Sequence, residues 1–291
     1  MPQSSNLRGI MAMVLAGITF VSCDSFLKML VTHDVPPLQA LVLRGISATL
    51  WCLGLLAVMG QLRELPKAFG FWTLMRALAE VVAVTAFIIA LANVPLADIT
   101  AIYQAAPLIV LAGASLFWGE HVGFLRWLLI GIGLAGALVV AQPGASGSSP
   151  LALLGLITAL GSAVRDLLSR KAPSDAPGLV ITFTVIVAVL AVSAVNTLIF
   201  ETWTPVTGEL ALYALGAGFF VMLGHFFVFM SFRLASAQAV APFYYSFTLV
   251  AAIFGVLFFS EWPNTMALIG IAMIIVCGLG VLLFEKKDVK P

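Results

Sequence analysis

Long apolar runs alternate with short polar breaks along almost the whole chain. Each run has about 20 residues, the length that a helix needs to cross the hydrocarbon core of a bilayer. The breaks contain proline, glycine, asparagine or charged residues, which interrupt helices. The pattern predicts an all-α polytopic membrane protein with ten transmembrane helices. The predicted spans are residues 10–31, 37–59, 70–91, 97–118, 124–142, 150–170, 178–199, 210–231, 238–260 and 265–284.

The basic residues between these spans all fall on one side of the membrane. No lysine or arginine follows the first, third, fifth, seventh or ninth span. Because positive residues collect in cytoplasmic loops, both termini are predicted to be cytoplasmic. The predicted location is the plasma membrane, the inner membrane of a bacterium. The residues that carry this bias are Arg8, Arg63, Lys67, Arg126, Arg170, Lys171, Arg233, Lys286, Lys287 and Lys290.

Composition agrees with a membrane protein and excludes several functions. Of the 291 residues, 62% are hydrophobic and 9% are charged, whereas a soluble domain has about 25% charged residues. No polar stretch is long enough for a fused catalytic domain. The net charge of +1 gives no basic surface for nucleic acid. The predicted partners are therefore the lipid bilayer and a small-molecule substrate.

The chain also contains an internal repeat. Shifting the first half by 141 residues aligns landmarks in the two halves, and each half has five spans. An odd number of spans places the second half upside down in the membrane, as in the inverted repeats of secondary transporters. We predict a first repeat over 1–142, a linker over 143–149 and an inverted second repeat over 150–291. The aligned landmarks are Asp34-Val35-Pro36 with Asp175-Ala176-Pro177, Tyr103 with Tyr244, and Glu120 with Glu261.

One pair of local motifs lies at corresponding places in the two halves. Phe117-Trp118-Gly119-Glu120 precedes Leu129-Ile130-Gly131, and Phe258-Phe259-Ser260-Glu261 precedes Leu268-Ile269-Gly270. With Arg44 in the second span, these motifs resemble the drug/metabolite transporter superfamily in its form with two EamA-type repeats. The resemblance covers nearly the whole chain and implies carriage of small metabolites. Within the superfamily, the chain looks most similar to aromatic amino-acid exporters of the YddG type.

Charged residues inside the spans are the first candidates for a substrate site. Each costs roughly 2.5–3.5 kcal/mol in the bilayer core unless it has a partner or faces a cavity. Asp24 with Lys28, and Arg76 with Glu80, are four residues apart and are expected to pair along one helix face. Such pairs either line a cavity or simply hold helices together. Arg44 has no acid within four residues, which favours a functional role.

Two further intramembrane charges, Arg165 and Asp166, are adjacent in the sixth span. Neighbouring positions do not share a helix face, so no pairing along a face is expected. Both are predicted to lie near the cytoplasmic end of the span, where the arginine side chain reaches the headgroups.

Aromatic hydroxyls and one histidine complete the candidate site. Tyr103 and Tyr244 are repeat mates at matched depth, and Gln104 and Tyr245 follow them. Tyrosines at such positions either flank an apolar substrate side chain or pack two helices together. His225 lies well inside a span, where it either takes up a coupling proton or is a neutral, hydrogen-bonded residue.

Several signals are absent from the sequence. No glycine-rich loop followed by Lys and Ser or Thr is present, so no ATP site is predicted. No metal cluster or nucleophile with a nearby base stands out, and no cofactor is predicted. Small residues at Gly131/Ala135 and Gly133/Ala137 indicate close helix packing. This packing is either within one chain, which we favour, or between the chains of a homodimer.

The sequence therefore predicts a secondary transporter and no enzyme. The leading hypothesis is export of aromatic or hydrophobic amino acids by alternating access. Arg44 with Lys28 or Arg76 would hold the carboxylate, and Asp24 or Glu80 would face the ammonium. The alternatives are a carrier of anionic metabolites such as sugar phosphates or nucleotides, a multidrug efflux protein, and an intramembrane enzyme acting on lipids.

Overall fold

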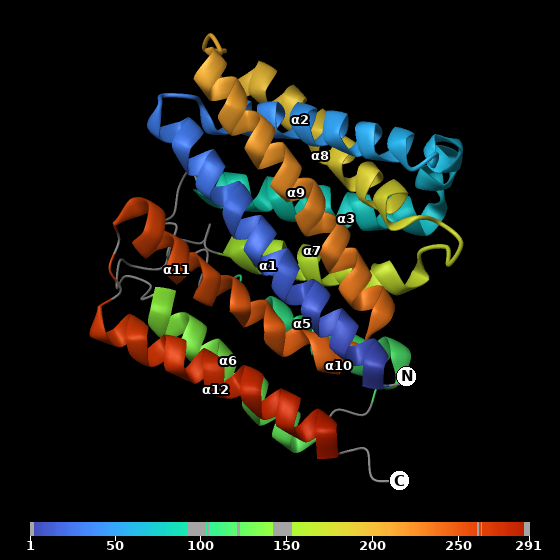
Figure 1. Ribbon diagram of the computed structural model, residues 1–291, viewed down its shortest axis with the longest axis vertical. Coiled ribbons are helices and arrows are strands. Elements are labelled where there is room, and N and C mark those ends of the chain that lie inside the picture. Colours follow the sequence, from blue (N-terminus) through green and yellow to red (C-terminus); the bar gives the residue numbers. More distant parts are fainter. Residues whose placement is uncertain are drawn as a thin grey trace.

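The computed structural model describes residues 3–91, 103, 105–120, 123–141, 153–260, 262 and 264–287. Within these residues every regular element is a helix (Figure 1). The α-helices are α1 (Gln3–Thr32), α2 (Pro37–Val58), α3 (Phe71–Leu91), α5 (Ala106–Trp118), α6 (Phe124–Ala141), α7 (Leu153–Leu168), α8 (Gly178–Phe200), α9 (Gly208–Leu234), α10 (Ala237–Val240), α11 (Ser246–Phe259) and α12 (Thr265–Lys287). Three 3-10 helices are η1 (Leu62–Phe69), η3 (Ser169–Lys171) and η4 (Ala241–Tyr245).

A described helix overlaps each predicted span, although α1 begins seven residues earlier than predicted and α5 nine residues later. Among the described residues, five helices are long and apolar enough to cross a membrane, and the number rises to six if η1 and α3, which meet at 73°, form one span. The chain is therefore a multi-pass helical membrane protein, whereas ten crossings remain a prediction. The five spans are Asn6–Thr32, Pro37–Val58, Gly178–Phe200, Gly208–Leu234 and Ala237–Phe258.

The outer surface fits a lipid environment. Large apolar side chains are widely exposed on it, including Val58 at 87%, Leu198 at 84% and Phe124 at 83%. In water such a surface would aggregate, but in a bilayer it faces acyl chains of similar polarity. The helices satisfy their own backbone hydrogen bonds, as a chain inside lipid must do.

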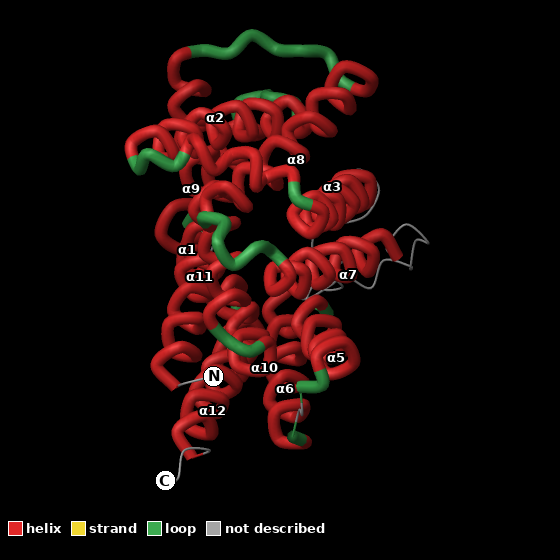
Figure 2. Tube along the Cα trace, turned by 90° about the vertical axis from the view of Figure 1, so that its right-hand side faces the viewer, coloured by secondary structure: helices red, strands yellow, loops and turns green. Residues whose placement is uncertain are grey.

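Each helix contact described below has a counterpart between the repeat-related helices or joins two repeat-related helices. Helix α1 packs on α9 as α7 packs on α3, and α1 contacts α11 as α7 contacts α5. The α2–α9 contact likewise has its counterpart in α8–α3. Helices α2 and α8 pack on each other, as do α6 and α12, which lie side by side at one edge (Figures 1 and 2). An internal two-fold repeat produces this arrangement.

Two helix ends repeat the same pattern in detail. Gly119 ends α5 and Ser260 ends α11, and both are left-handed, with φ of 65° and 56°. The two residues are 141 positions apart in the chain, so they are repeat mates. Glycine adopts this conformation freely, whereas serine is strained in it. The shared cap shows that the left-handed ending is used even where the sequence lacks glycine.

The helix that follows α9 is interrupted. Pro242 lies at the start of η4, which separates α10 from α11. Proline removes a backbone donor and disrupts the regular helix. The tighter 3-10 winding of η4 determines where Tyr244 and Tyr245 project.

Two of the small residues of α6, Gly133 and Gly136, pack closely within the chain, whereas Gly131, which the sequence predicted to lie in a close helix contact, has no atom of another element within 4 Å of an added Cβ. An added Cβ at Gly133 would lie 2.4 Å from the Tyr245 ring, and one at Gly136 would lie 2.8 Å from the Gly270 carbonyl oxygen. This is the intrachain use of small residues that the sequence favoured.

Candidate substrate cavity

A cavity of about 200 Å³ lies among α1, α3, α7, α9 and the η4–α11 segment, with Tyr103 in its wall. Three phenylalanines, Phe20, Phe87 and Phe247, supply part of its apolar lining. The polar side chains on the wall are Asp24, Glu80, Tyr103, Thr158, Ser162, Arg165 and Tyr244. An apolar pocket with a few convergent polar groups is the usual form of a small-molecule site.

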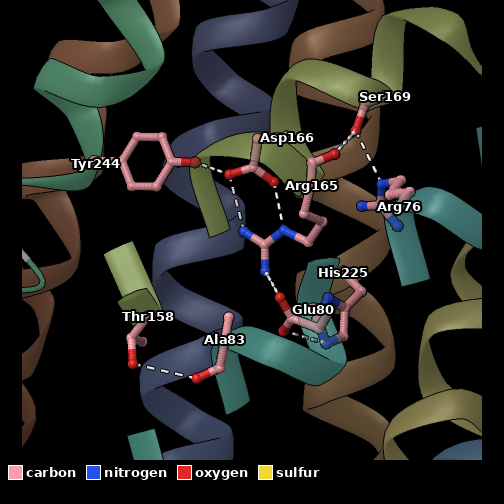
Figure 3. A network of polar contacts seen from close by, with 9 residues as sticks. All are labelled: Arg76, Glu80, Ala83, Thr158, Arg165, Asp166, Ser169, His225 and Tyr244. Atoms are coloured by element: carbon pink, nitrogen blue, oxygen red, sulfur yellow. Dashed lines mark hydrogen bonds and ion pairs between the residues drawn. The ribbon is translucent and has the colours of Figure 1, made fainter. Parts of the chain in front are cut away.

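Arg165 joins the cavity to a buried ionic network (Figure 3). Its Nη1 donates to Glu80 Oε2 at 2.7 Å, and its Nε and Nη2 donate to the two carboxylate oxygens of Asp166 at 2.6 and 2.9 Å. Only 4% of Arg165, 6% of Glu80 and none of Asp166 is exposed. The Glu80–Arg165 bond ties α3 to α7, and the network is well shielded from solvent.

Two further residues bond to this network, one at Asp166 and one at the backbone of Arg165. The Tyr244 hydroxyl donates a short hydrogen bond to Asp166. Ser169, one turn further along, donates to the Arg165 carbonyl oxygen at 3.3 Å. Tyr244 also stacks on Phe247, with ring centroids 5.8 Å apart. The tyrosine thus contacts both the charged network and the aromatic wall of the cavity.

His225 of α9 lies beside the other carboxylate oxygen of the network. Its Nε2 is 3.8 Å from Glu80 Oε1, and its ring meets Phe20 edge-on with centroids 5.1 Å apart. Its Nδ1 has no hydrogen-bond partner among the described residues. Glu80 therefore lies between an arginine and a histidine while also facing the cavity.

Arg76 is the fourth ionic residue of this layer. It is fully buried, its Nε donates to Ser169 Oγ at 3.0 Å, and its guanidinium lies 5.4 Å from the centre of the Phe229 ring. Arg76 does not line the cavity. Two arginines and two acids give the layer no formal net charge when His225 is neutral. Removing one partner of such a buried pair typically costs about 3–5 kcal/mol.

The predicted pairing of these residues was wrong in two respects. Glu80 bonds to Arg165 of α7 rather than to Arg76 on its own helix. Arg165 and Asp166 are buried and bonded to each other, whereas the sequence indicated that they would be interfacial and unpaired along a helix face. The long arginine side chain can fold back onto an adjacent carboxylate, so helix-face geometry does not decide contacts between neighbours.

The remaining predicted residues divide between the cavity and its surroundings. Asp24 lines the cavity, and among the described residues it interacts with Arg44 of α2 rather than with Lys28. Arg44 is half-buried and Lys28 is exposed, and neither lines the cavity. The predicted Asp24–Lys28 pair is thus not formed in the described structure.

The predicted tyrosines also fall into two groups, those that line the cavity and one that does not. Tyr103 and Tyr244 both line the cavity, which agrees with the first of the two alternatives that their matched positions left open. Tyr245 is turned away from it, is fully buried, and packs where Gly133 of α6 meets Cys277 of α12. Gln104 lies outside the described residues.

The repeat relates three pairs of cavity residues. Tyr103 and Tyr244 are one pair, and Phe87 and Val228 are another. The third pair joins Asp24 to Arg165, again 141 positions apart. The two halves thus present opposite charges to the cavity at equivalent positions. The repeat alignment and the intramembrane charges, taken together, carried this signal in the sequence.

Sequence reasoning did not include Arg165 in the substrate site. A polar stripe along α7 was the available signal: Thr158, Ser162, Arg165, Asp166 and Ser169 recur at helical spacing in an otherwise apolar segment. Thr158 and Ser162 face the cavity with Arg165, and the Thr158 hydroxyl bonds to the Ala83 carbonyl oxygen at 3.2 Å. Such a stripe marks the face that meets the ionic layer.

Polar contacts join the two halves of the chain at the end where the loops carry basic residues. There Lys67 bonds Asp175 at 2.6 Å, Arg170 bonds Glu120, and Arg126 bonds Gln238. In each contact one residue comes from 1–142 and the other from 150–291.

The opposite end is closed by contacts of the same kind. Glu201 accepts hydrogen bonds from the Leu38 and Gln39 amides at 2.9 and 2.8 Å, and the Gln39 side chain bonds Thr204. Glu201 thereby caps the first turn of α2, where a negative charge is favourable.

A polytopic helical protein whose two halves enclose a small, mainly apolar cavity with a few charged groups has the architecture of a small-molecule transporter. Comparison with known proteins agrees. The model of the EamA-like transporter family matches residues 7–142 and again residues 149–284. The chain therefore belongs to this family, which is part of the drug/metabolite transporter superfamily.

Named relatives are also transporters. The Riboflavin transporter of Rhizobium johnstonii is 27% identical over 97% of this chain and 94% of its own length. The S-adenosylmethionine uptake transporter of Rickettsia felis is 27% identical over 75% of this chain and 73% of its own. The Pseudopaline exporter CntI of Pseudomonas aeruginosa is 27% identical over 92% of this chain and 93% of its own. These names indicate transporters rather than enzymes, and none of them names an amino-acid exporter.

A solved crystal structure has the same fold. It is 18% identical in sequence, covers 100% of both chains and superposes with a TM-score of 0.81.

Proposed function

We propose that this protein is a secondary transporter of small zwitterionic metabolites, and that aromatic or hydrophobic amino acids are its substrates. The proposed direction is export by alternating access. The observation that carries the proposal is the pair of opposite charges, Asp24 and Arg165, at repeat-related positions on one cavity wall. A zwitterion has an ammonium for the first and a carboxylate for the second.

Both poles have capacity for a ligand. Arg165 has five N–H donors, and its three bonds to Glu80 and Asp166 leave one N–H on each Nη. Asp24 has no hydrogen bond or ion pair with any residue that the structure describes, although Arg44 is near enough to interact with it electrostatically. In this proposal Arg44, which is outside the cavity lining, interacts with Asp24, and Arg165 takes the carboxylate-binding role that the sequence had given to Arg44.

The aromatic wall suits the side chain of such a substrate. Phe20, Phe87 and Phe247 supply apolar area, while Tyr103 and Tyr244 add hydroxyls. Aromatic rings favour offset or edge-on contacts with another ring. The volume of about 200 Å³ is below the roughly 300–1,000 Å³ that is common for ligand pockets, which favours a single amino acid over a nucleotide.

For the membrane arrangement we propose ten spans in an inverted five-plus-five repeat, with both termini cytoplasmic, in a bacterial inner membrane. The double family match, the matched helix pairs and the equivalent caps at Gly119 and Ser260 support the repeat. The one-sided basic loops support the orientation. Gly133 and Gly136 of α6 are packed within the chain, which supports a monomer.

Alternating access follows from the contacts at the two ends. Opening one end requires breaking Lys67–Asp175 and Glu120–Arg170, and opening the other requires breaking the Glu201 and Gln39 contacts with their partners. Because every one of these contacts joins the two halves, the halves can separate at one end while the other stays closed. Rocking of repeats about a central site is the usual mechanism of such folds.

We further propose that His225 takes up the coupling proton if transport is proton-driven. Its position 3.8 Å from Glu80 supports this role. A protonated His225 would attract Glu80 and weaken the competing bond to Arg165. Proton uptake would thereby be coupled to the bond between α3 and α7.

A second candidate substrate is a riboflavin-like heteroaromatic compound. The match to a riboflavin transporter over 97% of this chain favours it, as do the aromatic walls. Riboflavin has neither an ammonium nor a carboxylate, so its transport would not depend on Asp24 as an ammonium partner. This difference separates the two candidates experimentally.

The test is counterflow in proteoliposomes containing the purified protein and labelled phenylalanine, with and without a pH gradient. We expect uptake above empty liposomes, a roughly tenfold loss in Asp24→Asn, and near-normal uptake in the control Glu209→Gln, whose carboxylate accepts a bond from Tyr213 of its own helix outside the cavity. Riboflavin counterflow that is insensitive to Asp24→Asn, with no phenylalanine uptake, would replace the amino-acid proposal by the second candidate. Competition by a phosphate ester or a lipophilic cation alone would assign the cavity to anionic metabolites or to drugs.

A further inference from the structure

The two buried arginines of the ionic layer are unequally satisfied. Arg165 donates three hydrogen bonds to two carboxylates. Arg76 donates only from Nε, to the neutral hydroxyl of Ser169, while its Nη1 and Nη2 have no partner among the described residues. A buried charged group without partners is costly, and such a feature calls for an explanation.

The acids that could neutralise Arg76 are nearby. Glu80 and Asp166 both interact electrostatically with the Arg76 guanidinium, although neither is bonded to it. The Phe229 ring lies with its centre 5.4 Å from the guanidinium. This cation–π contact offsets only part of the cost of burying the Arg76 charge. The layer therefore contains a second position for a carboxylate, which is not used in this structure.

We propose that Arg76 is the alternate partner of Glu80. When the carboxylate of a substrate binds Arg165, the Glu80 side chain leaves Arg165 and pairs with Arg76. This inference rests on the proposed function, because it requires a substrate that carries a carboxylate. It makes Arg76 a positioning residue, which acts on the substrate through Glu80.

Electrostatics provides the reason for the exchange. A substrate carboxylate at Arg165 would be the third negative group around one guanidinium, in a site from which water is largely excluded. Like charges repel strongly there, since the low dielectric screens them little. With His225 neutral, Arg76 is the other cation of the described layer. Transfer of Glu80 to it leaves Arg165 with Asp166 and the substrate carboxylate, and gives the free Nη groups of Arg76 a carboxylate partner.

Geometry selects Glu80 rather than Asp166 for this movement. Glu80 is four residues from Arg76 on α3, a spacing at which side chains of one helix meet. Its carboxylate is held by one bond from Arg165. Asp166 is held by two bonds from Arg165 and one from Tyr244. The pair that the sequence predicted, Arg76 with Glu80, is then the substrate-bound arrangement.

The exchange would also couple binding to movement. Glu80–Arg165 is the ion pair that ties α3 to α7, and these helices come from the two halves of the chain. Transfer of Glu80 to Arg76 turns an interhelix ion pair into one within α3. The binding of a carboxylate would thereby loosen one connection between the halves.

The experiment measures binding of labelled phenylalanine and of phenethylamine, its analogue without the carboxylate, to the full-length protein in nanodiscs. Arg76→Gln should weaken phenylalanine binding roughly tenfold and leave phenethylamine binding unchanged. Arg76→Lys should restore most of the affinity because it restores a cation. The double variant Arg76→Gln with Glu80→Gln should also restore it, because the amide at position 80 carries no charge that must be moved.

Arg233→Gln is the matched control. Arg233 lies over the same Phe229 ring at 5.6 Å but bonds to backbone carbonyls outside the ionic layer. Arg233→Gln should have the same effect on the binding of phenylalanine as on the binding of phenethylamine. If Arg76→Gln does not fold, a double-mutant cycle of Arg76→Lys and Glu80→Asp is measured in its place. The two substitutions should show a coupling energy for the binding of phenylalanine and none for the binding of phenethylamine.

Three results would overturn the inference while the wild type binds phenylalanine: equal effects of Arg76→Gln on both ligands, no effect on either, or no recovery in the double variant. Failure of the wild type to bind any carboxylate-bearing ligand would instead overturn the proposed function, and this inference with it.

Discussion

Helices α3 and α7 pack against each other as their repeat mates α9 and α1 do, but the two interfaces differ in chemistry. Between α3 and α7 lie Arg76, Glu80, Arg165 and Asp166. The repeat mates of Arg76 and Glu80 are Ala217 and Val221, which are buried in an apolar cluster that also contains Cys23 and Met222. One interface is therefore built like a hydrophobic core, while the other carries charges that packing alone does not require.

The comparison shows where the chemistry of the two interfaces is not explained by the repeat. The internal repeat explains why both helix pairs exist, but not why one of them keeps four ionisable residues at a considerable cost in lipid. At one pair of positions the difference reaches the cavity itself, where Asp24 is opposite in charge to Arg165. Replacing the charges, exchanging them between interfaces or separating the helices should therefore have different effects on the two pairs.

The largest effect is expected from Arg165→Met. It leaves the buried carboxylates of Glu80 and Asp166 without their shared cation, so stability should fall by about 3–5 kcal/mol, with transport lost. Thermal unfolding of the purified protein measures the first effect. Adding Asp166→Asn, which leaves Glu80 to balance Arg76, should recover most of the stability without restoring transport. Wild-type stability in the single variant would contradict the ionic role of Arg165.

A mirror pair of substitutions compares the interfaces directly. Val221→Glu introduces a carboxylate into the apolar α1–α9 cluster and should destabilise by roughly 2.5–3.5 kcal/mol. Glu80→Val leaves the buried layer one acid short, so it should destabilise by about 3–5 kcal/mol and also abolish transport. Unfolding midpoints and phenylalanine flux per folded protein, measured on both variants, should show that both are destabilised and that Val221→Glu keeps the larger flux. Equal flux in the two variants would show that the two interfaces are equivalent.

Helix separation should have a more moderate effect. An added Cβ at Gly161 would lie 2.9 Å from the Ala79 carbonyl oxygen and would push α3 from α7, whereas one at Gly9 would meet the Ala235 Cβ near the α1–α9 contact. Overpacking of this kind costs about 1–3 kcal/mol. Both alanine variants should lose stability, but only Gly161→Ala should raise the KM for phenylalanine, because it lengthens the Glu80–Arg165 bond. An unchanged KM would show that the Glu80–Arg165 bond does not contribute to substrate binding.

The smallest effect is expected outside the cavity, at Lys67–Asp175. A hydrogen bond from Lys67 lowers the pKa of the exposed Asp175 carboxyl. The stability that this bond contributes is present above the unfolded-state pKa and is lost as the pH falls through the lowered one. Asp175→Asn should therefore remove a weak, salt-screened stability difference between neutral and acidic pH. Unfolding midpoints at both pH values, with and without added salt, test this.

Much of the fold could be predicted from the sequence, because apolar length and helix breakers act locally. The repeat also placed Tyr103 and Tyr244 in one wall. The pairing of Glu80 was not predictable, since it depends on how closely α3 and α7 approach. Tyr245 was misplaced for a different reason: the 3-10 turn after Pro242 changes the angle between successive side chains, so its neighbour faces the cavity while Tyr245 faces α6 and α12.

The central claim is that the cavity recognises a zwitterion by an acid pole at Asp24 and a basic pole at Arg165. Competition against labelled phenylalanine counterflow tests it most directly, with phenylalanine, phenethylamine and 3-phenylpropanoate as unlabelled competitors on the wild-type protein. The account predicts that phenylalanine competes best and that either analogue is weaker by roughly tenfold, because each lacks one ionic contact. Equal competition by all three, or competition by riboflavin alone, would contradict it.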